Sequence, residues 1–127
     1  MEQDVKTALK VTDIKPKIGS VIHADREVLL GGKYANEILD LLEERGVLVF
    51  PQVNFTDDEQ RQFTNTFGSI AVERTGEDVF TISLDPEKTS AVEYLKGSLY
   101  WHFDGTMQPM PVSASILCAK VLSARRQ

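Results

Sequence analysis

Two residues in the C-terminal third of the sequence have side chains that together can hold a metal ion. His102 and Asp104 are separated by one residue in the segment 100–106, which reads YWHFDGT. On a β-strand, residues two apart point to the same face, so this spacing places an imidazole beside a carboxylate. Non-haem Fe(II) oxygenases bind iron through two histidines and one carboxylate on one face of the metal. So short a pattern also recurs by chance, and the alternative is a hydrogen bond between the two side chains at a strand end.

The N-terminal third of the sequence predicts short strands around an amphipathic helix. Apolar residues at helical spacing predict a helix over 33–45, and Gly46 suits the left-handed conformation just past its end. Before this helix, the pattern over 11–24 predicts a β-hairpin. After it, the continuous apolar run over 47–50 predicts a strand buried on both faces.

A second helix has a clear start signal in the sequence. Thr56-Asp57-Asp58-Glu59 matches the capping box, in which the threonine and glutamate side chains satisfy free backbone N–H groups. Phe63 and Phe67 lie one turn apart on this helix and are expected to point at the core, and Gly68 is expected to end it.

The remaining sequence predicts strands joined by loops. A polar loop over 85–98, with Val92, Tyr94 and Leu95 tucked down, separates the first of these strands from the others. The predicted strands cover 79–84, 100–104 and 112–122. The order of elements indicates an N-terminal region of mixed α and β structure (α+β), followed by the beginning of a β-sandwich or barrel.

Composition restricts the class of protein. The 127 residues fit one domain, and their formal net charge of −5 argues against nucleic acid or an anionic membrane as the main partner. The single cysteine, Cys118, excludes an intramolecular disulfide and a zinc site built from cysteines, and it is expected to act as a small core hydrophobe. The polar N-terminus shows no signal peptide and no stretch is apolar enough to span a bilayer, so a cytoplasmic location is expected by default.

The sequence resembles the taurine dioxygenase (TauD/TfdA) family of Fe(II)- and 2-oxoglutarate-dependent dioxygenases. Four blocks carry the resemblance in the family's order, and the resemblance extends over essentially the whole chain up to Ser123. They are residues 41–50, residues 56–63 with Phe67-Gly68, residues 101–106 and residues 111–117.

The resemblance implies a fold, cofactors and site residues. It implies the N-terminal part of a double-stranded β-helix (jelly-roll, clavaminate synthase-like) fold, with two helices packed on the sheet, an incomplete core and a single truncated domain over 1–127. His102 and Asp104 match the family's first two iron ligands, with 2-oxoglutarate as co-substrate and a small sulfonate, sulfate-ester or carboxylate as substrate. Ser98 and Thr106 match positions that can contact substrate, although a loop serine and a turn residue are the plainer interpretations.

The sequence departs from the family pattern after the metal pair. The family takes a second histidine and an arginine from further along the chain, and the other histidine here, His23, lies upstream of the pair. Arg125 and Arg126 stand where the family has a glycine turn, so we do not expect them to clamp the co-substrate. A frameshift, a premature stop or an incomplete gene model would account for this ending. The chain is therefore expected to be inactive alone.

Two non-enzymatic alternatives remain open at this point. The first is an interaction module whose open sheet edge self-associates or binds a longer homologue. The second is a metal-binding β-protein in which two copies each donate His102 and Asp104. Both alternatives allow a homo-oligomer. An incomplete β-sandwich is also expected to leave some apolar side chains without packing partners, namely Phe80, Ile82, Trp101 and Ile116. For Trp101, core packing is the default expectation.

Overall fold

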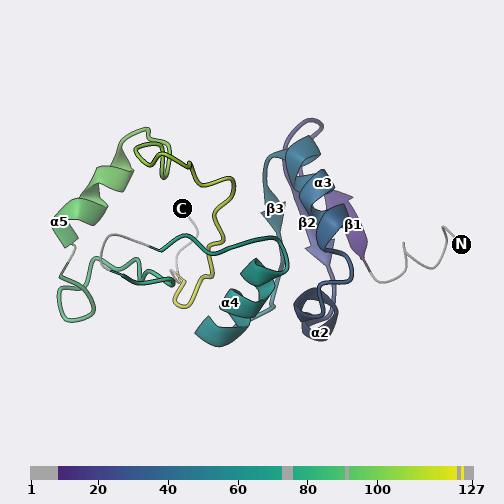
Figure 1. Cartoon of the computed structure of the whole chain (residues 1–127), viewed down its shortest axis with the longest axis horizontal. Coiled ribbons are helices and arrows are strands. Elements are labelled where there is room, and N and C mark those ends of the chain that lie inside the picture. Colours follow the sequence, from purple (N-terminus) through teal and green to yellow (C-terminus); the bar gives the residue numbers. More distant parts are fainter. Residues whose placement is uncertain (1–8, 73–75, 91, 123, 125–127) are drawn as a thin grey trace, which may run out of the picture. The chain divides into compact units, whose positions relative to one another are not determined.

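The structure is a computed structural model of the chain, and it describes residues 9–72, 76–90, 92–122 and 124 (Figure 1). The chain divides into two compact units. The first comprises the described residues of Met1–Ile70 and Cys118–Gln127, and the second comprises those of Ala71–Leu117. Within the described ranges, no helix is long and apolar enough to cross a lipid bilayer.

The first unit contains a small mixed sheet of three strands in the order β1-β2-β3. The strands are β1 (Lys10–Asp13), β2 (Ser20–His23) and β3 (Leu48–Val49). β1 and β2 run antiparallel, whereas β2 and β3 run parallel. The antiparallel pair confirms the hairpin predicted over 11–24. The central strand is the buried one, since Ser20 and Ile22 are almost completely covered.

The strand predicted over 47–50 forms only as the two-residue β3, and its burial on both faces was wrong. Val47 and Val49 are 51% and 42% exposed. A continuous apolar run indicates a central strand covered on both sides. Among the residues that the structure describes, β3 lies at the edge of the sheet and pairs with β2 alone, so part of its surface stays open.

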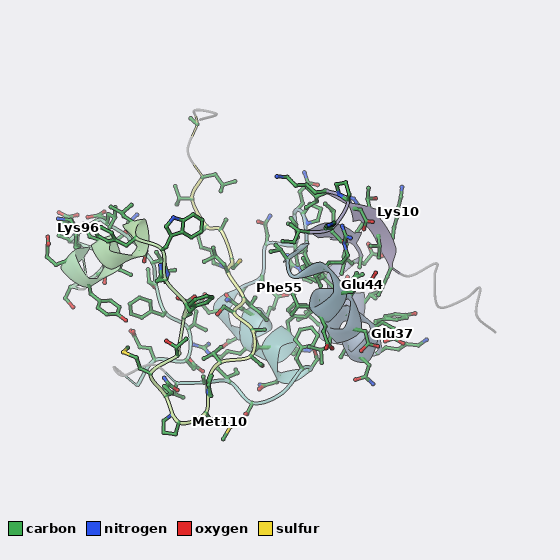
Figure 2. The ribbon with its side chains drawn as sticks, turned by 90° about the horizontal axis from the view of Figure 1, so that it is seen from above. Lys10, Glu37, Glu44, Phe55, Lys96 and Met110 are labelled. Atoms are coloured by element: carbon green, nitrogen blue, oxygen red, sulfur yellow. The ribbon has the colours of Figure 1, made fainter. Side chains whose placement is uncertain are left out.

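Helix α3 (Ala35–Arg45) confirms the predicted amphipathic helix and lies beside the sheet (Figure 1). Its buried side includes Ala35 and Ile38, and its acidic residues Glu37 and Glu44 face outward (Figure 2). Gly46 follows the helix with φ of +74°, the left-handed conformation expected there. The chain can thus reverse directly into β3.

Helix α4 (Asp57–Asn65) begins at the predicted capping box. The Thr56 hydroxyl accepts the Glu59 backbone N–H at 3.2 Å, and the Glu59 carboxylate accepts the Thr56 N–H at 3.1 Å. Phe63 on this helix is buried against a half-buried Phe67, with ring centroids 4.8 Å apart. The helix ends at Asn65, three residues before the predicted Gly68.

A short helix that the sequence analysis did not predict, α2 (Arg26–Leu30), packs against α4. Arg26 joins the two helices, because its guanidinium lies 3.2 Å from the Glu59 carboxylate and donates to the Val53 carbonyl at 3.1 Å. Hydrogen bonds from the Thr56 backbone N–H hold the pKa of Glu59 below its ordinary value. Burial opposes this shift, and the Thr56 hydroxyl and Arg26 reinforce it.

A buried arginine at the end of α3 holds the turn between β1 and β2. The Arg45 guanidinium donates to the carbonyls of Pro16 at 3.1 Å, Lys15 at 2.5 Å and Gly19 at 3.1 Å, and its Nε–H donates to the Ser20 hydroxyl at 3.0 Å. The Arg45 carbonyl in turn accepts the Gly19 N–H at 2.9 Å. One residue therefore fixes the hairpin turn from both its side chain and its backbone.

The second unit contains the short helix α5 (Val92–Leu95) and the 3-10 helix η1 (Lys96–Leu99). The sequence analysis had interpreted this stretch as loop. Of the three residues expected to tuck down, Leu95 is buried and Val92 is half-buried, but Tyr94 is 72% exposed.

The strands predicted over 79–84, 100–104 and 112–122 are not formed. Apolar alternation specifies which side of a strand is buried, but a strand also needs a partner for its N–H and C=O groups. The ladders in the described part of the chain are β1–β2 and β2–β3 alone. The α+β class is therefore present as helices with one small mixed sheet.

The apolar residues expected to lack partners fall into two groups. Phe80 and Ile116 are half-buried. Ile82 is 63% exposed, and Trp101 is fully exposed, so the expected core packing of Trp101 was wrong. A tryptophan two residues beyond a 3-10 helix, with no strand to place its side chain against a sheet, has no layer to pack on.

Candidate metal centre

The structure brings the two predicted metal ligands together without a strand. His102 Nε2 lies 3.3 Å from Asp104 Oδ1, and the two side chains are 46% and 69% exposed. They lie in an irregular segment that follows η1. The two side chains lie close together as predicted, although the β-strand from which this was predicted is not formed.

A backbone carbonyl orients the His102 ring. His102 Nδ1 lies 2.7 Å from the Tyr100 carbonyl oxygen, which can only accept a hydrogen bond. The ring must therefore carry its proton on Nδ1, and Nε2 faces the Asp104 carboxylate. Nε2 can meet that carboxylate either as a second N–H in the charged imidazolium or through a cation held between the two groups.

The spacing of the two donor atoms fits adjacent ligands of one metal ion. Ligand atoms about 2.1 Å from a metal are separated by about 3.0–3.4 Å when they are neighbours in octahedral or tetrahedral geometry. The 3.3 Å between His102 Nε2 and Asp104 Oδ1 lies in that range. Metal-binding histidines also commonly donate their other ring N–H to a backbone carbonyl, as His102 does to Tyr100.

The described residues bring no third donor to this pair. No group of three or more His, Cys, Asp or Glu side chains suited to a metal occurs among them. The other histidine, His23, ends β2 and is exposed, in agreement with the surface position expected for it. Cys118 is half-buried and its thiol lies 3.8 Å from the Phe55 carbonyl oxygen. The pair thus supplies two protein ligands.

The turn after the pair depends on a glycine. Gly105 has φ of +66°, and a Cβ there would lie 2.8 Å from a methyl carbon of Val112. A side chain at this position would meet both backbone strain and a steric clash. Gly105 therefore lets the chain turn back immediately after Asp104.

The two predicted substrate-contacting residues occupy different places. Ser98 belongs to η1 and lines an open hollow of about 400 Å³ that also includes His102, with Leu99, Tyr100 and Trp101 as the other lining residues. Thr106 is exposed and is not part of that lining. Arg125 and Arg126 lie outside the described residues.

The sequence analysis missed the Tyr100 carbonyl as the group that orients His102. Every residue carries a backbone carbonyl, so no residue type signals this role. On a β-strand the Tyr100 carbonyl would bond to a neighbouring strand and could not reach the His102 ring. Its position two residues before His102 therefore indicates this role only when the segment is known to be irregular.

Comparison with known proteins identifies the family of this chain. The family model described as "Taurine catabolism dioxygenase TauD, TfdA family" matches residues 10–125, and the chain belongs to this family. A curated relative is the (S)-phenoxypropionate/alpha-ketoglutarate-dioxygenase of Sphingobium herbicidovorans, which is 25% identical over 83 residues. That match covers 62% of this chain and 29% of the relative, so the chain spans well under half of the relative's length. No solved structure matches the chain.

Proposed function

We propose that this chain is the N-terminal part of an Fe(II)- and 2-oxoglutarate-dependent dioxygenase and contributes His102 and Asp104 as two of its iron ligands. The observation that carries the proposal is the 3.3 Å approach of His102 Nε2 to Asp104 Oδ1, with Nδ1 satisfied by the Tyr100 carbonyl. Membership of the TauD/TfdA family and a relative named as an alpha-ketoglutarate dioxygenase support it.

The residues have distinct roles in this proposal. His102 and Asp104 hold the metal, and the Tyr100 carbonyl keeps the imidazole in the tautomer that presents Nε2. Iron with 2-oxoglutarate, when bound, supplies the oxidising chemistry that hydroxylates the substrate. Ser98 lines the same hollow as His102, which supports a proposed contact between Ser98 and the substrate, and Thr106 follows the pair in the chain.

The substrate class that we propose is a small organic acid. The family's taurine name and the relative's phenoxypropionate name point to sulfonates and aryloxy carboxylates respectively. Both classes carry an anionic group on a compact body, and a sulfate ester shares that chemistry.

We further propose that both compact units belong to one jelly-roll domain whose sheet is only begun here. The three-stranded sheet of the first unit and the exposed apolar side chains of the second support this view. With two histidines in the whole sequence and only His102 at the pair, we expect the isolated chain to turn over little substrate. Conversion of 2-oxoglutarate to succinate at the rate of a complete enzyme would contradict this expectation.

The ligand assignment is tested by anaerobic metal titration of the purified chain. Fe(II) or Co(II) is expected to bind the unmodified protein, whereas His102→Ala and Asp104→Ala each lose most of that binding. His23→Ala is the matched control, because it removes the other histidine from an exposed position and should bind metal normally. Equal metal binding by His102→Ala and the unmodified chain would show that the pair is not the site.

A further inference from the structure

The loop that precedes α4 has an unusual backbone conformation. Gln52 and Asn54 have φ of +57° and +50°, the left-handed region that residues other than glycine seldom adopt. Such residues persist where surrounding contacts fix them. The side chain of Phe55, at the end of this loop, is buried and packs against Phe63 with ring centroids 5.3 Å apart. Phe55 therefore anchors one end of the loop, and its strained part needs further contacts to hold it.

Two cationic side chains hold three consecutive carbonyls of this loop. Arg26 of α2 donates to the carbonyl oxygens of Val53 at 3.1 Å and Asn54 at 3.4 Å. The next carbonyl oxygen, that of Phe55, accepts a hydrogen bond from the Lys120 ammonium. Lys120 lies 65 positions beyond Phe55 in the chain, so this last contact closes a long stretch of chain onto the loop.

A second side chain from the same segment reaches the same carbonyl. The Cys118 thiol lies 3.8 Å from the Phe55 carbonyl oxygen, and Cys118 is half-buried. Residues two apart point to the same side of an extended backbone, which agrees with residues 118 and 120 reaching one acceptor. Leu117 and Val121 on either side are 79% and 84% exposed. We call residues 118–120 the latch.

The latch lies where the chain returns from the unit that carries the metal pair. The chain leaves the first unit after Ile70, beyond the end of α4, and re-enters it at Cys118. The latch contacts Phe55, which lies just before the start of α4. The departing and the returning segments are thus attached to the first unit near the two ends of one helix.

We propose that the latch is a conformational switch, which opens while the rest of the first unit stays folded and exposes the Cys118 thiol when it opens. Among the described residues, the side-chain hydrogen bonds of the latch end on one carbonyl, so its opening costs little compared with unfolding of the unit. Opening also frees the Phe55 carbonyl and removes one contact that holds the strained loop. The latch does not include His102 or Asp104, so it is independent of the proposed function.

The experiment measures how fast N-ethylmaleimide alkylates Cys118, the one cysteine of the sequence, in the full chain by mass spectrometry. Lys120→Met keeps the apolar stem and removes the donor. It should react about three- to tenfold faster, the range for loss of one charge-assisted hydrogen bond at an exposed side chain. Lys120→Arg keeps a cationic donor and should stay near the unmodified rate. Lys96→Met is the matched control, because it removes an exposed ion pair with Glu93 and should not change the rate.

Urea distinguishes opening of the latch from unfolding of the first unit. Local opening exposes little surface, so the alkylation rate should change little below the urea concentrations at which circular dichroism reports unfolding. Equal rates in Lys120→Met and the unmodified chain would overturn the proposal. A rate that rises steeply from the lowest urea concentrations would also overturn it, because the thiol would then be reached through unfolding. So would an unmodified chain that reacts as fast as the denatured one.

Discussion

At the scale of single residues, Arg45 shows how a buried charge can organise backbone. Its guanidinium is 7% exposed and meets three carbonyls and a hydroxyl. Asp13, with its carboxylate 3.5 Å from Nε, supplies the nearest negative charge. The arrangement gives the donors of the guanidinium acceptors and at the same time ties carbonyls of the exposed β1–β2 turn to the end of α3.

Replacing Arg45 by methionine should therefore destabilise the first unit. The methionine fills much of the space but removes the hydrogen bonds from the guanidinium to the turn carbonyls and to the buried Ser20 hydroxyl, at a cost on the order of 2–4 kcal/mol in the free energy of unfolding. Urea denaturation followed by circular dichroism measures this. The control is Arg61→Ala, which breaks an ion pair with a mostly exposed Asp58 and should cost less than about 1 kcal/mol. Equal losses in the two variants would contradict the role given to Arg45.

Glu59 should make stability depend on acidic pH. The pKa of its carboxyl is lowered in the folded chain, mainly by the Thr56 backbone N–H, so the folded state favours the ionised form. A lowered pKa contributes stability above the unfolded value, about 4.3, and this contribution is lost as pH falls through the folded value. Glu59→Gln keeps an acceptor but removes the titration. The free energy of unfolding measured between pH 3 and 6 should fall more steeply toward acid in the unmodified chain than in Glu59→Gln.

Residue types alone predicted the metal-ligand side chains of the candidate centre but not the backbone groups that hold them in position. A histidine and a carboxylate two apart are visible in the sequence, and they do lie within 3.3 Å. The Tyr100 carbonyl and the tight fit of Gly105 against Val112 depend on the path of the backbone, which no residue type records. Gly105→Ala should accordingly weaken cobalt binding in the titration described above, whereas Gly97→Ala, where a Cβ would meet nothing within 4 Å, should not.

At the scale of elements, the two helices that the sequence predicted, α3 and α4, form because their signals are local, whereas the short helices α2 and α5 were not predicted. The capping box at Thr56 and the amphipathic pattern before Gly46 involve residues within one or two turns of each other, and both α3 and α4 form where expected. Strands depend on partners that are distant in sequence. The hairpin β1–β2 carries its own partner and was found, while the three C-terminal strand predictions rested on apolar patterns with no partner in the described residues.

The end of α3 offers a direct test of a conformational requirement. At Gly46, φ is +74°, but an added Cβ would meet only Ile18 Cγ1 at an ordinary 3.8 Å. Alanine there should fit sterically and still cost about 1 kcal/mol in the free energy of unfolding, because its left-handed conformation is strained. Gly68→Ala is the matched control, since Gly68 has no such φ and open space around it. A neutral Gly46→Ala would show that the turn into β3 tolerates another path.

At the scale of the whole molecule, the two units differ in how their backbone is held. The first contains the sheet, α2, α3 and α4 around Ile22, Ile38 and Phe63, whereas residues 101–117 of the second form neither helix nor strand. The second unit also exposes most of its large apolar side chains, including Met110 (Figure 2). Local stability follows buried apolar contact and regular backbone hydrogen bonding.

Hydrogen–deuterium exchange should report this difference. We expect slow exchange for amides of β2, α3 and α4 and fast exchange for peptides covering 101–117 in the metal-free chain. Adding Co(II) should slow exchange in 99–107, because a bound ion would link His102 to Asp104 within this segment. Unchanged exchange in that segment, with cobalt bound, would contradict the assignment of this pair as the metal ligands.

The contact between Arg45 and the β1–β2 turn also has a consequence for the order of folding. The residues that close the hairpin turn, 14–19, share four hydrogen bonds with Arg45, which lies 26 to 30 positions later in the chain; Arg45 donates three of them and accepts the fourth from the Gly19 N–H. Hairpin closure is thus tied to the docking of α3, and neither element reaches its final form first. The transition state for folding of this unit should contain both, so substitutions in the turn and at Arg45 should slow folding rather than speed unfolding. The nascent chain can complete this nucleus before the metal-binding segment has been synthesised.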